Sequence, residues 1–153
     1  MRGRLAGFRF VVVGLALAGL IAFMARPAHG RPISVNAPPY VIHAADDAAR
    51  MYDYRLPFYI EVISWRTPRG LRDMLLDSGD LSMAVEYDRL SGGQKIGTSR
   101  LILLSQNMGL EQMSDAVRHE VAHLINWDIN GYYVQEHGSD FAAICERVGG
   151  SNC

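Results

Sequence analysis

Residues 111–126 most restrict what this chain can fold into, because their apolar side chains follow a helical period. These side chains recur at intervals of four, four and three residues: Met113, Val117, Val121 and Leu124. Such a stripe predicts an amphipathic helix with one face packed on a core. The polar residues of the segment lie off the stripe, so a second side of the helix can face a cleft.

The segment Arg-His-Glu-Val-Ala-His, residues 118–123, lies within this helix. A random order of the same composition would produce His-Glu-x-x-His in roughly 0.6 % of chains, so the match invites a functional interpretation. A helix advances about 100° per residue, which brings His119 and His123 onto one face, close enough to share a metal ion. Glu120 flanks this pair, where a carboxylate can take a proton from a metal-bound water and pass it to a leaving amine.

A catalytic zinc site needs a third protein ligand and one open position. The downstream candidates are Asp128, Glu136, His137 and Asp140. His137 is the best of them, because it lies just before a second predicted helix, residues 139–148, where a chain reversal can return it to the first helix. Gly138 would allow the entry turn, and the Asn130-Gly131 turn starts a connection long enough for the return.

The remaining pattern predicts a small α+β domain. A helix is expected at 41–52, a strand at 58–65, a short helix or turn at 69–77, and strands at 81–87 and 100–105. The glycine-rich run at 91–99 lacks the Gly-Lys-Ser/Thr ending of a phosphate loop and precedes a strand, so we expect a hairpin loop. The predicted fold is a small, mostly antiparallel three-stranded sheet with an N-terminal helix, the His-Glu-x-x-His helix and a C-terminal helix.

The first thirty residues predict a signal peptide. Three arginines precede an uncharged apolar run at 10–24, which is shorter than the roughly 20 residues of a membrane-spanning helix. Residues 28–30 offer a small-x-small cleavage site. An uncleaved membrane anchor is the alternative. We therefore expect a signal or anchor at 1–30, a leader at 31–39 and the folded domain at 40–153, placed outside the cytoplasm as a secreted or periplasmic protein.

The charge of the chain without its first thirty residues argues against nucleic acid as a partner. That segment holds four arginines and no acidic residue, so 11 basic and 16 acidic residues remain, a net charge of −5. A polyanion-binding surface needs clustered lysine and arginine, whereas this chain has one lysine and scattered arginines.

The two cysteines, Cys145 and Cys153, lack the spacing of a metal or redox site. An exported protein could join them in a disulfide. The alternative is a buried Cys145 packed on a helix and a loose terminal Cys153.

Three stretches resemble the catalytic core of the SprT-like zinc metallopeptidases, a branch of the zincins: SRLILLSQNM at 99–108, AVRHEVAHLI at 116–125 and EHGSDFAAICERVG at 136–149. The resemblance extends over about residues 58–149. It implies a zincin-like fold and a Zn²⁺ site whose ligands are His119, His123 and His137, with Glu120 as general base. The chain departs from the family at Glu136, where glycine usually precedes the third histidine.

These features predict an exported zinc-dependent metallopeptidase that hydrolyses peptide bonds by zinc-activated water, with Glu120 as general base. The expected partner is a protein or peptide substrate, laid along an exposed sheet edge for which residues 100–105 are the candidate strand. Membrane contact is expected only through an uncleaved N-terminal segment. Tyr132 and Tyr133 are expected to pack and not to stabilise an oxyanion.

Two other functions fit the same residues. One is a zincin-like domain that binds zinc for structure or partner recognition without turnover. The other is a zinc hydrolase of a different bond, such as a cell-wall amide.

Overall fold

The computed structural model describes residues 32–34, 36–131 and 137–153, so the signal or anchor predicted at 1–30 lies outside the described residues. The elements follow in the order β1 (Pro32–Ser34), α2 (Pro39–Met51), β2 (Phe58–Val62), α3 (Arg69–Ser78), β3 (Ser82–Ser91), β4 (Gln94–Leu104), α4 (Leu110–Asn130) and α5 (Ser139–Arg147). Among the described helices, none has the length and apolar character needed to cross a membrane. The α+β prediction is confirmed.

Four strands form one mixed sheet in the order β1-β2-β4-β3. β2 pairs in parallel with both β1 and β4, whereas β3 pairs antiparallel to β4. The prediction of three mostly antiparallel strands was therefore wrong. The edge-strand prediction for 100–105 was also wrong, because β4 is paired on both sides. Its continuous apolar run Leu101–Leu104 suits a strand buried on both faces. The two edge strands are β1 and β3, and the side of β3 that faces away from β4 forms the open edge.

The sheet begins inside the segment predicted as a leader. β1 pairs with β2, and the side chain of Asn36 extends this pairing to Val62: its amide donates to the Val62 carbonyl at 2.6 Å, and its carbonyl accepts from the Val62 N–H at 2.7 Å. Pro32 fits there because an edge strand does not need every N–H as a donor. The folded part of the chain thus starts before residue 40.

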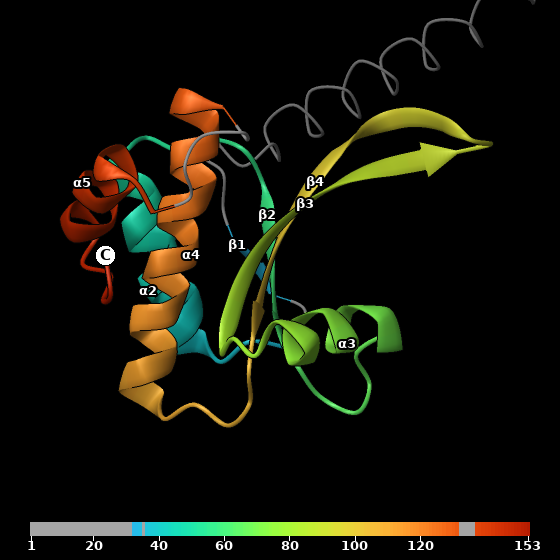
Figure 1. Cartoon of the computed structure of the whole chain (residues 1–153), viewed down its shortest axis with the longest axis horizontal. Helices are drawn as coiled ribbons and strands as arrows, with labels where there is room; N and C mark the ends of the chain where they lie inside the picture. Colours follow the sequence, from blue (N-terminus) through green and yellow to red (C-terminus); the bar gives the residue numbers. More distant parts are fainter. Residues whose placement is uncertain (1–31, 35, 132–136) are drawn as a thin grey trace, which may run out of the picture.

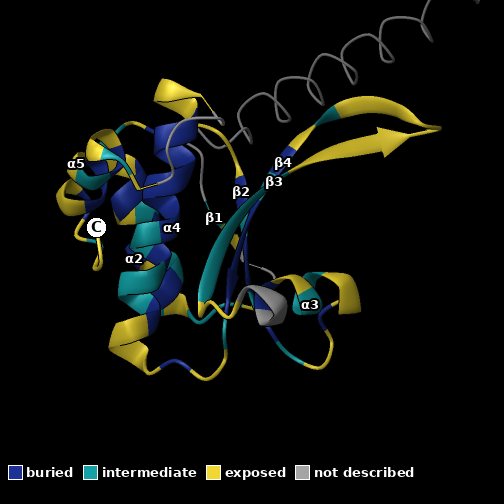
Figure 2. Ribbon diagram, viewed as in Figure 1, coloured by how far each residue is buried: buried dark blue, intermediate teal, exposed yellow. Residues whose placement is uncertain are grey.

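The predicted hairpin exists, but its loop is shorter than expected. β3 ends at Ser91 and β4 begins at Gln94, so Gly92 and Gly93 make the turn. Both have positive φ, +57° and +81°, a conformation that glycine adopts without steric cost. Most of the predicted loop is therefore strand. The far half of this hairpin is exposed and extends away from the helices (Figures 1 and 2).

Helices cover both faces of the sheet (Figure 1). α2, α4 and α5 pack on one face, and their buried side chains contact Phe58, Ile60 and Ile102. α3 covers the other face, where Leu75 joins Leu103 in a smaller core. Figure 2 shows the buried residues concentrated in α2, α4 and the middle of the sheet. This packing places α4 beside the open edge of the sheet.

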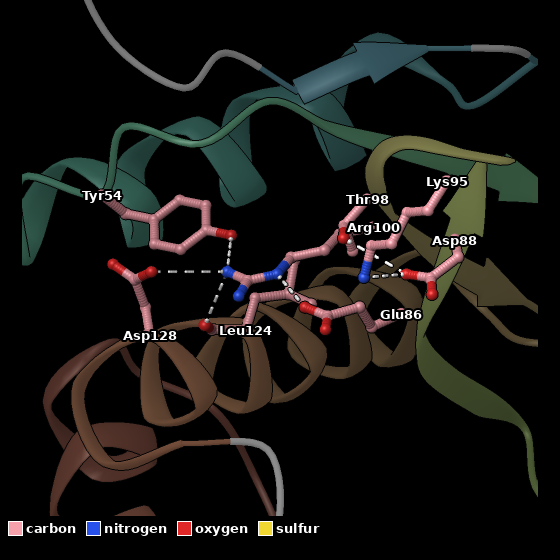
Figure 3. A network of polar contacts seen from close by, with 8 residues as sticks. All are labelled: Tyr54, Glu86, Asp88, Lys95, Thr98, Arg100, Leu124 and Asp128. Carbon is pink, nitrogen blue, oxygen red and sulfur yellow. Dashed lines mark hydrogen bonds and ion pairs between the residues drawn. The ribbon is translucent and has the colours of Figure 1, made fainter. Parts of the chain in front are cut away.

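A partly buried arginine links the hairpin to α4 (Figure 3). Arg100 on β4 donates to the Glu86 carboxylate on β3 at 2.8 Å and to the Tyr54 hydroxyl at 2.5 Å. It also donates to the Leu124 carbonyl at 3.3 Å and lies 3.8 Å from the Asp128 carboxylate, both on α4. Burial raises the pKa of Tyr54, so its phenol keeps its proton. The network fixes β4 against the helix that carries the histidine pair.

Candidate metal centre

Three imidazoles come together between α4 and the start of α5. His119 and His123 lie one turn apart on α4, and His137 lies just before α5. Nε2 of His119 is 3.3 Å from Nε2 of His123 and 3.3 Å from Nε2 of His137. One ring nitrogen of each residue lies within 4.8 Å of the other two. The structure thus brings together the three histidines predicted as ligands, in a group that could hold a metal ion.

The protonation of the two α4 histidines suits metal binding. Burial, and then the neighbouring imidazoles of His119 and His137, lower the pKa of His123 to about 3. Burial also lowers the pKa of His119; a hydrogen bond to Ser151 opposes this effect and His137 adds to it. Both rings are therefore neutral near pH 7, and a neutral imidazole is the form that coordinates a metal. Three imidazole nitrogens are a donor set that Zn²⁺ accepts.

Phe141 on α5 packs against all three imidazoles. Its ring stacks on that of His123, with centroids 4.2 Å apart and planes at 26°. It meets the rings of His119 and His137 edge-on, at centroid distances of 5.0 and 4.9 Å. The helical period of 139–148 places Phe141 on an apolar face, but it does not indicate that this face lies beneath the ligands. The ring restricts the orientations that the histidines can adopt.

Glu120 is buried, with 4 % of its surface exposed, and a residue of β3 donates a hydrogen bond to its carboxylate. The hydroxyl of Ser82, the first residue of β3, donates to Oε1 of Glu120 at 2.6 Å. Sequence reasoning missed Ser82. The available signal was the alternation of 81–87, which separates Ser82 from the apolar side chains of Leu81 and Met83.

A cleft of about 420 Å³ opens over these groups. Its lining comprises the first four residues of β3, Ser82 to Val85, together with Met74, Asp80, Leu81, His119, Glu120, His123, Trp127 and His137. Consecutive residues of one strand, from both faces of the sheet, contribute to this lining. The cleft therefore follows the open edge of β3.

The register of β3 decides which of its residues point their N–H and C=O groups away from β4. The Leu81 carbonyl accepts a hydrogen bond from the Ser105 N–H. Because inward and outward groups alternate in an antiparallel pair, Met83 directs its backbone groups toward β4. Ser82 and Ala84 direct theirs outward, into the cleft.

Of the other candidate ligands, the two that the structure describes, Asp128 and Asp140, do not join the histidines. Asp128 faces Arg100 at 3.8 Å, and Asp140 is exposed in the first turn of α5. Glu136 and the two tyrosines considered for oxyanion contact, Tyr132 and Tyr133, lie outside the described residues.

Comparison with known proteins gave one finding. Residues 81–152 match the model of the SprT-like family. The match spans β3, β4, α4 and α5, and it includes the three histidines, Glu120 and Ser82. No curated protein and no solved structure matches the chain.

Proposed function

Because residues 81–152 of this chain are SprT-like, we propose that it is a zinc-dependent metallopeptidase that hydrolyses peptide bonds in protein or peptide substrates. The observation that carries the proposal is a cluster of three histidines next to a buried carboxylate in an open cleft. His119, His123 and His137 would hold the ion. When bound, zinc would supply a Lewis acid that polarises the substrate carbonyl and lowers the pKa of a water molecule.

Glu120 is proposed as the general base. Its carboxylate would accept a proton from the attacking water and deliver it to the amine that leaves. The hydrogen bond from Ser82 to Oε1 restricts rotation of the carboxylate, so the group is oriented before substrate binds. A metal site with a purely structural role would gain nothing from such a carboxylate.

The substrate is proposed to bind along β3, in place of the strand predicted from sequence. An extended peptide can pair with the outward backbone groups of Ser82 and Ala84, which adds one strand to the sheet. The cleft offers apolar contacts from Met83, Met74 and Trp127. Backbone pairing would provide affinity for many sequences, and these side chains would favour apolar residues in the substrate.

We also propose that the protein acts outside the cytoplasm. The signal-like residues 1–30 support this location, and so does a disulfide between Cys145 and Cys153, because such bonds persist in oxidising compartments. The net charge of −5 for the remaining chain supports a protein substrate and not a nucleic acid.

Metal analysis and one isosteric substitution test the proposal. The purified protein is expected to bind about one equivalent of zinc. Glu120→Gln is expected to keep the zinc and to lose activity on a cleaved protein by about 10²-fold or more. Glu111→Gln is the matched control, because Glu111 is an exposed residue in the first turn of the same helix.

Each result separates the candidate functions. Absence of bound zinc would exclude both the peptidase and a zinc-binding domain without turnover. Zinc without hydrolysis of any protein in an extracytoplasmic mixture would favour the non-catalytic domain, or a hydrolase of a cell-wall amide if wall fragments are cleaved. An unchanged rate for Glu120→Gln would contradict the general-base assignment.

A further inference from the structure

The chain after α5 folds back onto the metal centre. Cys145 within α5 and Cys153 form a disulfide, with Cα atoms 5.6 Å apart, which decides between the two alternatives left open by the sequence. Cys145 is fully buried. The disulfide therefore closes residues 149–153, which we call the C-terminal tail, against the helix that carries Phe141.

One backbone carbonyl of this tail contacts a predicted ligand. The Ser151 carbonyl oxygen lies 3.1 Å from Nδ1 of His119. A carbonyl can only accept a hydrogen bond, so Nδ1 must carry the hydrogen. In the neutral ring Nε2 then has a free lone pair, and Nε2 is the atom that lies 3.3 Å from the ring nitrogens of His123 and His137.

The tail is fitted closely to the helix that carries His119. Gly149 has a φ of +74°, and the Gly150 N–H donates to the Cys145 carbonyl at 2.9 Å. A Cβ at Gly150 would lie 2.8 Å from the Cys145 sulfur and 3.3 Å from the backbone nitrogen of His119. Only glycine allows this approach without displacing the tail. The disulfide and the two glycines thus hold the tail where its Ser151 carbonyl contacts Nδ1 of His119.

We propose that the C-terminal tail, closed by the Cys145–Cys153 disulfide, is a positioning element of the metal centre. Its Ser151 carbonyl fixes the tautomer and the orientation of His119 so that Nε2 is presented to the ion. The inference rests on the proposed metal site. Hydrogen-bond partners of ligating histidines contribute about 10- to 100-fold to metal affinity, so release of the tail is expected to weaken zinc binding by that factor.

Zinc affinity of three variants tests the role of the tail, measured by competition with a chromophoric chelator. Cys145→Ala/Cys153→Ala removes the closure and leaves no thiol that could bind zinc, and Gly150→Ala displaces the tail sterically. Both are expected to weaken zinc binding by about 10- to 100-fold. Ser151→Ala is the matched control; because it keeps the carbonyl, its affinity is expected to equal that of the wild type.

A second measurement does not require metal. Long-range ¹H–¹⁵N spectra of the zinc-free wild type are expected to show His119 with its hydrogen on Nδ1, and those of the double cysteine variant a mixture of tautomers. A hydrogen on Nε2 in the wild type would overturn the proposal, even if the variants fail to fold. Equal zinc affinity in the wild type and both tail variants would also overturn it, while a wild type that binds no zinc would overturn the metal centre itself.

Discussion

The hydrogen bond from Ser82 to Glu120 allows a test of whether one hydroxyl orients the proposed general base. Ser82→Ala removes a hydrogen bond to a buried carboxylate, and such bonds contribute about 1.5–3 kcal/mol. We expect kcat to fall by roughly tenfold or more, because the general base loses its orientation. Zinc content should not change, since Ser82 is not among the grouped histidines.

Two further substitutions control this result. Ser82→Thr keeps a hydroxyl and should recover much of the activity, while Ser91→Ala changes an exposed serine at the far end of β3 and should have no effect. If kcat of Ser82→Ala equals that of the wild type, the hydroxyl does not position the base.

His123 makes the stability of the metal-free protein depend on pH. Its pKa is about 3 in the folded protein, compared with about 6.5 in an unfolded chain. Between these values the unfolded chain binds the extra proton, so stability is complete above pH 6.5 and is lost as the pH falls toward 3. From pH 7 to pH 5 the free energy of unfolding should decrease by about 2 kcal/mol through this residue.

Urea denaturation of the chelator-treated protein at several pH values measures this dependence. His123→Gln should show a shallower loss of stability between pH 7 and pH 5, because glutamine does not titrate. Identical slopes for the two proteins would show that His123 is not responsible.

At the scale of elements, the open edge of β3 can be probed without breaking the sheet. Ala84→Pro removes an outward N–H within the cleft, and it leaves the hydrogen bonds to β4 in place. We expect the variant to fold and to raise KM for an extended peptide by about tenfold, since one substrate hydrogen bond is lost.

Asp88→Pro is the matched control for this edge. It also removes an outward N–H from β3, but Asp88 does not line the cleft. Its ion pair with Lys95 is half-exposed, so its loss should matter little. Equal KM values for Ala84→Pro and Asp88→Pro would place the substrate elsewhere.

Local periodicity was sufficient for some elements and insufficient for others. α4 and α5 were predicted because apolar residues at a spacing of three and four mark a helix wherever it packs. The order of the strands depends on pairing between distant segments, for which local alternation gives no information. The apolar run Leu101–Leu104 did indicate an interior strand, and treating it as an edge ignored that signal.

At the scale of the whole molecule, the site combines contacts of very different sequence separation. His119 and His123 are four residues apart, so one predicted helix was enough to place them together. His137 could be proposed because a catalytic site needs a third ligand and the chain was expected to reverse before the next helix. The partners that orient the site come from further away: Ser82 is 38 residues from Glu120, and Ser151 is 32 residues from His119. Only the assembled fold reveals such contacts.

The Arg100 network is one of the connections between the hairpin and α4, so its loss should destabilise the domain. Arg100→Met leaves the Glu86 carboxylate without its ion-pair partner at a site where the arginine is only 11 % exposed. The pair is partly buried, since the Glu86 side chain is 26 % exposed, and the loss of a hydrogen bond to a charged group costs about 1.5–3 kcal/mol. The midpoint of urea denaturation should therefore shift strongly.

Lys95→Met offers a matched control on the same hairpin (Figure 3). Lys95 and Asp88 also form a cross-strand ion pair, at 2.6 Å, but their side chains are 56 % and 50 % exposed. Solvent screens such a pair, and its loss should leave the midpoint of urea denaturation almost unchanged. Equal destabilisation by the two substitutions would mean that burial does not set the strength of the Arg100 network. A loss confined to Arg100→Met would show that the partly buried network stabilises the packing of the hairpin on α4.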